Sequence, residues 1–195
     1  PSLLIELLQN VKGTKDERIQ YSPERMEETI KLAVKKSNWG NTTEGTYQGF
    51  SAYYSHNTHV AEVADIEMKN GMPLVKKVTV AVDCGIVVNP LGAKNQVEGG
   101  VIDGIGHAMY GDFSFKEGTP QAVNFDNYRL IRMQETPEVS THFVESGLSP
   151  TGLGEPGLPP AGGAVANAIH TATGERLLKQ PFINELEMSK SKILG

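Results

Sequence analysis

The sequence predicts an α+β fold, in which antiparallel strands and helices follow one another without a regular repeat. Two segments of alternating apolar and polar residues are separated by Asn70-Gly71, a dipeptide typical of tight antiparallel hairpins. Segments with helical spacing precede and follow this hairpin, and the strict strand–helix–strand alternation of parallel α/β folds is absent from the pattern. The chain has 195 residues, enough for one sizeable domain or two small ones.

Residues 1–44 are expected to form a helical N-terminal segment, with a short helix and a loop over residues 1–20. A second helix is predicted to begin at Ser22-Pro23-Glu24, which supplies an N-cap hydroxyl, a proline in the first turn and an acidic residue. Apolar residues then recur at helical spacing, and Gly40 lies just beyond the expected end. We interpret this helix as structural.

Three strands are predicted between residues 46 and 88. Tyr47 to Ser55 is rich in aromatic residues, and Val60 to Met68 alternates between two faces. Leu74 to Val82 is the returning strand of the hairpin at Asn70-Gly71. One face of the second strand carries Val60, Glu62, Ala64, Ile66 and Met68.

Residues 91–110 are predicted to form a helix with an apolar stripe and an unusual number of glycines. Each glycine costs about 1 kcal/mol relative to alanine inside a helix, so a close neighbour is expected against this backbone. That neighbour is either another helix or strand, or a cofactor, and composition alone favours the first. The glycines are Gly99, Gly100, Gly104 and Gly106.

The rest of the chain contains several shorter elements. A hairpin is predicted around Lys116 to Thr119, flanked by Gly111 to Phe115 and Gln121 to Phe125, and Val139 to Val144 is a further short strand. Ser146 to Pro160 is a loop rich in glycine and proline. A helix of small residues follows from Pro159 to Ala172 and is closed by Gly174. A last strand is expected over Leu177 to Ile183, and residues 184–195 form a charged tail.

Composition excludes several classes of function. The net charge is −5, which argues against a nucleic-acid surface because such a surface needs a basic face. The single cysteine, Cys84, excludes a disulfide within the chain and a thiolate-rich metal site. No apolar run approaches the roughly 18 residues of a membrane span, and the N-terminus has no signal-peptide pattern. Since the first residue is Pro1 and not Met, we expect a fragment or a processed chain.

Two sets of residues were candidates for chemistry. Among the five histidines only His56 and His59 are close in sequence, and on a strand this spacing puts them on opposite faces, so no metal site built from side chains is expected. The second candidate is Glu155, an isolated acid held between glycines and prolines. The amides at the start of the following helix favour an anion there, which suits a functional carboxylate. The residues alone favour the alternative, a surface turn with a solvated glutamate.

Larger blocks of sequence accompany this loop in a fixed order. They are Ala81 to Pro90 (AVDCGIVVNP) with Gln96 to Gly100 (QVEGG), then Asn124 to Tyr128 (NFDNY) with Arg132-Met133 and Pro137 to Val139, and finally Gly154-Glu155-Pro156 with Ala164 to Ile169 (AVANAI). In this order they resemble the molybdopterin-binding large subunit of the xanthine dehydrogenase and aldehyde oxidase family, over residues 45–183. Within it they are most similar to the isoquinoline 1-oxidoreductase beta-subunit branch, which also includes bacterial aldehyde-oxidising relatives.

The resemblance implies a fold and a chemistry. The fold is a mixed, largely antiparallel sheet with helices packed on it, as in molybdenum cofactor-binding domains. The family oxidises N-heterocycles or aldehydes with water as the oxygen source, and a glutamate that matches Glu155 is the catalytic base. The pterin, and not protein side chains, holds the metal. A glutamine that matches Gln96 hydrogen-bonds the pterin, and Gly99 and Gly100 would let it come close, as would the small residues Ala161, Gly162, Gly163 and Ala164.

The resemblance also implies partners. The cofactor would be molybdopterin, in its cytosine dinucleotide form, and electrons would pass to iron–sulfur clusters on a small partner subunit. Family subunits are several times longer than this chain, and their Gly-Gly-Gly-Phe-Gly segment is missing here, so residues 45–183 would be part of a molybdopterin-binding domain that the remainder of the subunit completes. We therefore expect little cofactor binding and no turnover from this chain alone. The alternative is a non-catalytic domain of the same ancestry that binds a pterin or a partner. The compartment, periplasm or cytoplasm of a bacterium, stays open.

Overall fold

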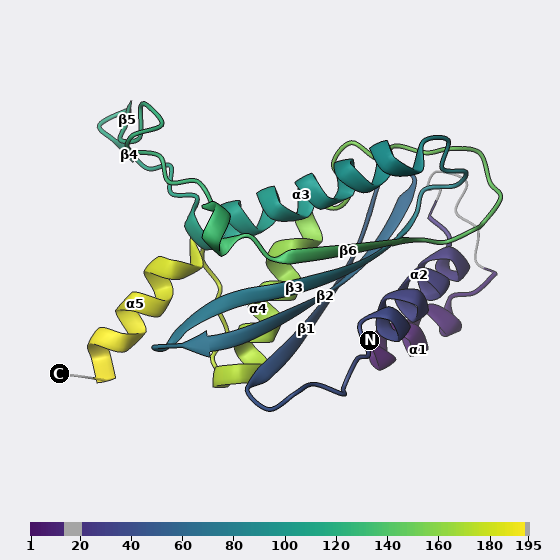
Figure 1. The fold of residues 1–195 in the computed structure, drawn as a ribbon, viewed down its shortest axis with the longest axis horizontal. Coiled ribbons are helices and arrows are strands. Elements are labelled where there is room, and N and C mark those ends of the chain that lie inside the picture. The colour runs from purple at the N-terminus through teal and green to yellow at the C-terminus, as the bar shows by residue number, and fades with distance from the viewer. Residues whose placement is uncertain (14–20, 194–195) are drawn as a thin grey trace.

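The computed structural model describes residues 1–13 and 21–193, and within these residues one sheet is covered on both faces by helices (Figure 1). The elements in chain order are α1 (Ser2–Asn10), α2 (Pro23–Lys36), β1 (Thr46–Ser55), β2 (Thr58–Lys69), β3 (Met72–Asp83), α3 (Pro90–Tyr110), β4 (Phe115–Lys116), β5 (Thr119–Pro120), a 3-10 turn (Met133–Glu135), β6 (Glu138–Phe143), α4 (Pro159–Thr173) and α5 (Phe182–Ile193).

The main sheet has the strand order β1-β2-β3-β6 and is mixed, as expected. The first three strands form an antiparallel meander, whereas β6 pairs in parallel with β3 after the long connection through α3. The predicted turn at Asn70-Gly71 joins β2 to β3, with φ values of 53° and 72° that suit these two residues. The α+β prediction is confirmed.

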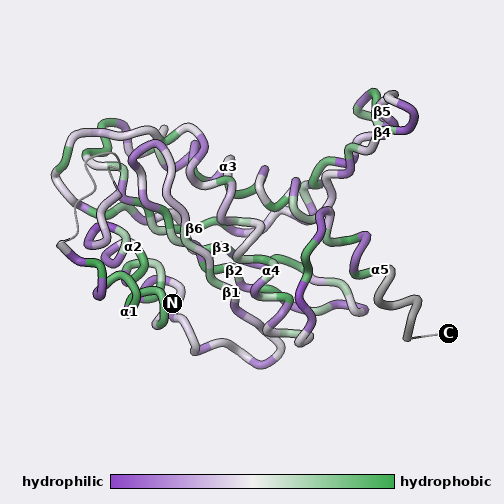
Figure 2. The backbone as a smooth tube through the Cα atoms, turned by 180° about the vertical axis from the view of Figure 1, so that it is seen from behind, coloured by the Kyte–Doolittle hydropathy of each residue, from purple (hydrophilic) through white to green (hydrophobic). Residues whose placement is uncertain are grey.

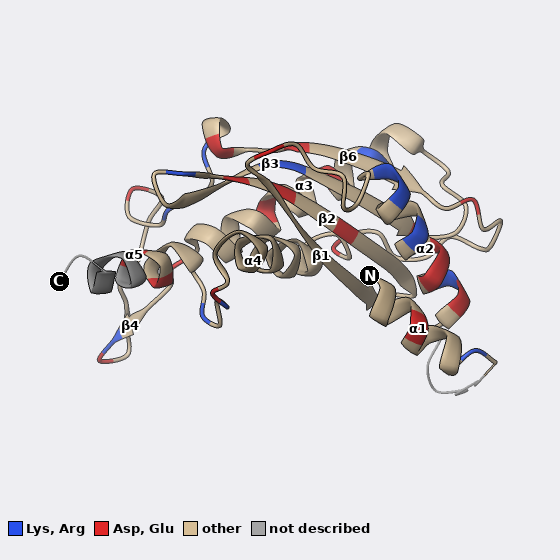
Figure 3. Cartoon of the chain, turned by 90° about the horizontal axis from the view of Figure 1, so that it is seen from below, with Lys and Arg blue, Asp and Glu red and all other residues tan. Residues whose placement is uncertain are grey.

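The two faces of the sheet carry different layers. The face that holds Val60, Ala64 and Ile66 packs against α3 and α4 in the larger hydrophobic cluster. The opposite face, which includes Ala61 and Ala81, packs against α1 and α2. Charged side chains gather along α2, whereas α4 contains none (Figure 3). The alternation predicted for β2 therefore separates a helix without Lys, Arg, Asp or Glu from a charged one.

Two glycines let α4 lie directly on its neighbours. A Cβ atom at Gly49 of β1 would stand 2.0 Å from the backbone nitrogen of Ala168 in α4. A Cβ atom at Gly104 of α3 would stand 2.3 Å from the carbonyl oxygen of Leu158, at the start of α4. Both contacts are with backbone atoms, which cannot move away as the end of a flexible side chain could. Protein packing thus accounts for Gly104, the first of the two alternatives left by the sequence.

The C-terminal prediction was wrong. Leu177 to Ile183 does not form a strand; α5 begins at Phe182 and continues through most of the segment expected to be a charged tail. Phe182 and Leu186 are both buried in the larger cluster, and their spacing of four residues matches one turn of a helix. Pro181, just before the helix, cannot donate to a strand ladder.

The arm that leaves the body after α3 contains a smaller hairpin than predicted. β4 and β5 pair over two residues each, and the flanking residues 111–114 and 121–125 are not strands. This arm, residues 111–132, extends away from the sheet and its helices (Figures 1 and 2). None of the described helices is long and apolar enough to cross a membrane.

Candidate functional site

The loop that carries Glu155 is held from three directions. The N–H of Thr151 donates to the carbonyl oxygen of Cys84 at the end of β3 (2.9 Å), and the N–H of Gly152 donates to that of His56 (3.1 Å). From the third side the Gln96 Nε2 of α3 donates to the carbonyl oxygen of Gly154 (2.5 Å). These anchors, at the end of β3, in the turn after β1 and on α3, fix the backbone on the N-terminal side of Glu155.

Glu155 itself points outward from this fixed backbone. Its carboxylate is 68% exposed, and Oε1 lies 3.7 Å from Nδ1 of His56. The next two residues, Pro156 and Gly157, are buried, because Gly157 packs on Val97 of α3. The loop therefore uses its proline and glycine to cover α3 and presents its acid to the outside.

The first turns of α3 form one wall beside this acid. Gln96 is exposed, and its amide, already bonded to Gly154, can donate a second N–H and accept at its own oxygen. A Cβ atom at Gly99 or at Gly154 would meet nothing within 4 Å, so both positions are open to an approaching group. Gly100 makes only ordinary contact, 3.6 Å from Leu158 N. These residues leave room for a polar group that approaches from outside the chain.

The four small residues at the start of α4 are in a different situation. Ala161 and Ala164 are buried in the core, and Gly162 and Gly163 face Ala108 of α3 and Ser51 of β1 at close range. Packing against protein gives each of them a reason to be small, and their role toward a cofactor stays a prediction. The helix N-terminus also offers fewer donors than expected, since Pro159 and Pro160 have no N–H.

A buried polar network stabilises the end of β3, to which the loop of Glu155 is hydrogen-bonded. Arg25 of α2 makes a two-pronged ion pair with Asp83, through Nε at 2.8 Å and Nη2 at 2.9 Å. Burial alone would raise the pKa of Asp83, but hydrogen bonds from Arg25, the Gly85 N–H and the Ser146 hydroxyl outweigh burial and lower it. The network holds the chain at Asp83 and Gly85, on either side of the carbonyl that receives Thr151.

The two histidines that are close in sequence have different surroundings in the fold. His59 lies on the α2 face of β2 with no exposed surface, and burial lowers its pKa to about 4. His56 is not on a strand but in the turn between β1 and β2, so the predicted arrangement on opposite strand faces was wrong for this residue. Among the described residues no group of three histidine, cysteine or acidic side chains could hold a metal.

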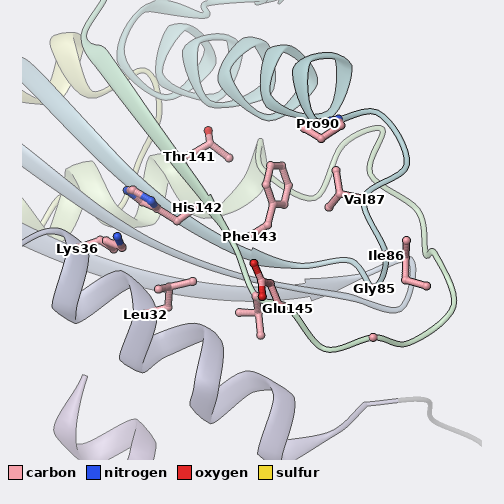
Figure 4. Close-up of a pocket in the computed structure, with 12 residues that line it drawn as sticks. Leu32, Lys36, Gly85, Ile86, Val87, Pro90, Thr141, His142, Phe143 and Glu145 are labelled. Atoms are coloured by element: carbon pink, nitrogen blue, oxygen red, sulfur yellow. The ribbon is translucent and has the colours of Figure 1, made fainter.

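A cavity of about 600 Å³ lies elsewhere, along β6 between α2 and the start of α3 (Figure 4). Its lining includes Lys36, His142 and Phe143, and neither Gln96 nor Glu155 takes part. The cavity and the anchored loop are therefore separate features of the surface.

Sequence reasoning missed the partners that hold the loop. Thr58 donates from its hydroxyl to the carbonyl oxygen of Gly152 (2.6 Å) and receives the hydroxyl of Thr151 (2.7 Å). His56 was considered only as a metal ligand. Both contacts join residues that are far apart in the sequence, and no local pattern announces them. A non-glycine pair in a tight turn, His56-Asn57, is the one signal that could have marked this turn as special.

Comparison with known proteins shows the family to which this chain is similar. A family model described as "Molybdopterin cofactor-binding domain" matches residues 7–137, which include Gln96 and end before Glu155. The chain is 32% identical over 169 residues to a membrane-bound aldehyde dehydrogenase (pyrroloquinoline-quinone) of Gluconacetobacter polyoxogenes, covering 80% of this chain and 21% of the relative. It is 30% identical over 167 residues to isoquinoline 1-oxidoreductase subunit beta of Brevundimonas diminuta, covering 83% and 21%.

Solved structures share the fold. Quinoline 2-oxidoreductase from Pseudomonas putida 86 superposes with a TM-score of 0.61 at 19% identity, over 68% of this chain and 18% of that one. The aldehyde oxidoreductase from Desulfovibrio gigas gives a TM-score of 0.55 at 24% identity, over 67% and 15%. The chain thus spans about a fifth of the length of its curated relatives. On the match of the family model to most of its length, this chain belongs to the molybdopterin cofactor-binding domain family.

Proposed function

We propose that this chain is the C-terminal part of a molybdenum hydroxylase, with Glu155 as the catalytic base. Such an enzyme would oxidise an N-heterocycle or an aldehyde with water as the source of oxygen. Electrons would pass to iron–sulfur clusters on a small partner subunit. The cofactor would be molybdopterin in its cytosine dinucleotide form.

One observation supports this proposal above the others. Gln96 and Gly154 belong to two sequence blocks 58 positions apart, and the fold brings them within a single hydrogen bond of 2.5 Å. The residue proposed to bind the pterin thereby touches the loop of the residue proposed to remove a proton. A chance surface turn has no reason to be fixed to the one exposed glutamine that the family pattern singles out.

The proposed roles follow from what each side chain can do. The cofactor, when bound, supplies the redox centre that takes two electrons from the substrate. Gln96 would hold the pterin through its free amide groups, while its bond to Gly154 sets how far Glu155 stands from that pterin. Glu155 would accept a proton at its carboxylate as the oxygen is transferred. A fixed backbone suits this task, because a general base must lie within reach of the proton that it removes.

The site needs a second wall, which we propose the remainder of the large subunit supplies. Glu155 is 68% exposed here, whereas a base at a hydroxylation centre works best in a space that excludes water. The projecting arm would dock on the same remainder, because its apolar side chains have little cover from this chain. Those more than half exposed are Phe113, Phe115, Val123 and Phe125. We therefore expect the 195-residue chain alone to bind little cofactor and to show no turnover.

The test is Glu155→Gln in the assembled enzyme. Glutamine keeps the shape of the side chain and cannot accept the proton, so kcat should fall by about 10² to 10⁴ while molybdenum and pterin contents stay unchanged. Glu145→Gln, an exposed acid near the loop but outside its anchors, is the matched control and should leave kcat near the wild-type value. A near-normal rate in Glu155→Gln would remove this residue from the base role.

A non-catalytic domain that only binds a pterin or a partner is the competing function. It gains support from the same exposure of Glu155, since a purely binding surface needs no dry site. Loss of pterin binding in Gln96→Ala, together with no turnover from the assembled wild-type protein, would favour it.

A further inference from the structure

The turn between β1 and β2 fixes the place from which a histidine side chain leaves the backbone. His56 and Asn57 have φ values of 53° and 61°, the left-handed conformation at both central positions of a two-residue hairpin. Asparagine and histidine adopt positive φ more readily than most other non-glycine residues. A short turn of this kind leaves the backbone of His56 little freedom.

The backbone of this turn is locked to the loop of Glu155. The carbonyl oxygen of His56 accepts the N–H of Gly152, and Thr58 holds the carbonyl of the same glycine. A Cβ atom at Gly152 would stand 2.6 Å from the Cβ of His56, so only glycine allows the turn and the loop to approach this closely. Movement of one segment must therefore move the other.

The imidazole faces the acid. Nδ1 of His56 lies 3.7 Å from Oε1 of Glu155 and 2.7 Å from the hydroxyl oxygen of Ser55. The ring is 55% exposed, so the far side of it can exchange a proton with water. The hydroxyl of Ser55 is thus within hydrogen-bond distance of Nδ1, the carboxylate of Glu155 is just beyond it, and both His56 and Glu155 are open to solvent.

We propose that His56 is a positioning residue and proton acceptor for Glu155, an inference that rests on the proposed function of that glutamate. Between transfers the Ser55 hydroxyl donates to Nδ1 and holds the ring beside the acid. When a side-chain rotation closes the 3.7 Å separation and frees Nδ1 from Ser55, the proton that Glu155 has taken up moves from its carboxyl oxygen to Nδ1. The ring then releases the proton on Nε2 to water, and exchange with water moves the remaining proton from Nδ1 back to Nε2. Glu155 is thereby returned to the carboxylate form, and the ring is neutral and able to accept again.

The chain contains its own control for this pair. His107 of α3 lies 3.7 Å from Asp103, and both side chains are more than half exposed, as in the pair of His56 and Glu155. The control pair is one helical turn within α3, away from the anchored loop. Any effect of an exposed histidine beside a carboxylate that is unrelated to the site should appear in both pairs.

The substitution of choice is His56→Asn, because asparagine suits the left-handed turn and removes the imidazole. In the assembled enzyme we expect kcat to fall roughly tenfold or more with KM unchanged, at the low end of general acid–base effects. Millimolar imidazole should restore part of this rate in His56→Asn and none in Glu155→Gln. His107→Asn should keep the wild-type rate. A merely structural role for His56 predicts no rescue by imidazole.

A readout on the 195-residue chain itself keeps the inference independent of the loaded enzyme. Ring ¹⁵N chemical shifts of His56 at neutral pH should change in Glu155→Gln and stay constant in Asp103→Asn, with the reverse pattern for His107. Unchanged shifts of His56, or a normal kcat in His56→Asn, would overturn the proposal for His56 alone. A normal kcat in Glu155→Gln would instead overturn the proposed function.

Discussion

The two faces of β2 bury ionisable side chains in opposite ways. On the α2 face, Asp83 of the neighbouring strand is 1% exposed and shares its charge with Arg25. On the α4 face, Glu62 has no exposed surface, and neither of its carboxyl oxygens has a hydrogen-bond partner among the described residues. Its neighbours across the sheet are Ser51 and Val80. The α2 face therefore buries an ion pair, whereas the α4 face buries a carboxyl group that has no hydrogen-bond partner among the described residues.

The difference follows from which helix covers each face. α2 carries Arg25 and can bring a counter-charge, whereas α4 consists of small apolar and neutral polar residues and brings none. Burial therefore raises the pKa of Glu62 well above its ordinary value, and the side chain enters the fold as a neutral acid. The small residues that let α4 lie close to the sheet also leave it without a basic side chain long enough to pair with the carboxyl group of Glu62.

The largest expected effect comes from breaking the paired side. Arg25→Gln leaves the buried carboxylate of Asp83 without its guanidinium, and loss of one partner of a buried pair costs about 3–5 kcal/mol of unfolding free energy. Urea unfolding at neutral pH measures this loss. Arg129→Gln is the control: that arginine, on the arm, is 40% exposed in its pair with Glu135 of the 3-10 turn, and about 0–1 kcal/mol is expected there. Equal losses in the two variants would contradict a buried, energetically dominant pair.

The next effect sharpens the unpaired side. The ordinary pKa of Glu62 is 4.5, and its folded pKa is raised, so above pH 4.5 the unfolded chain releases a proton that the folded chain retains. The contribution of this group to stability is thus full below pH 4.5 and is lost as pH rises toward the folded pKa. Glu62→Gln cannot ionise, and its stability relative to wild type should increase from pH 4.5 to pH 8.

Denaturant unfolding of both proteins at several pH values between 4.5 and 8 gives this comparison. Glu67→Gln, an exposed acid on the same strand, should show no such trend. The wild-type chain has an opposite trend from His59, whose lowered pKa of about 4 makes stability fall as pH drops below 6.5. A Glu62→Gln difference that is constant with pH would mean that the folded state holds Glu62 ionised.

Local patterns were sufficient for most of the fold. The alternation of apolar and polar residues correctly predicted that Glu62 and Ile66 lie on one face of β2. Asn70-Gly71 correctly predicted the hairpin, because few other residues adopt its positive φ values readily. What local patterns could not supply is pairing at a distance. β6 was predicted as a strand, but its parallel place beside β3 depends on where α3 and the arm return the chain. The prediction of a strand over Leu177 to Ile183 was wrong because a short apolar run is equally compatible with a strand and with the start of a helix.

The candidate site divides in the same manner. Glu155 and Gln96 were found from ordered blocks of sequence, and the hydrogen bond from Gln96 to Gly154 was not. The ring of His56 beside Glu155 had no local signal at all, because it depends on a turn and a loop that meet only in the folded chain. The covered positions of Ala161 and Ala164 were also beyond reach, since small residues suit protein neighbours and cofactors alike.

The smallest effect on stability is expected on the arm, which extends away from the sheet and its helices. Phe125 is 80% exposed and lines a shallow apolar hollow of about 290 Å³ with Phe113 and Tyr128. Phe125→Ser should change the unfolding free energy by less than about 0.5 kcal/mol, as for other exposed positions. It should also weaken binding of a hydrophobic dye, because large exposed apolar patches bind such dyes and docking partners alike. Ile105→Ser, at a core position that is 1% exposed, should instead destabilise the chain strongly. If Phe125→Ser destabilised the chain as much as Ile105→Ser, the arm would belong to the fold of this chain, and the docking surface proposed for the rest of the subunit would have to lie elsewhere.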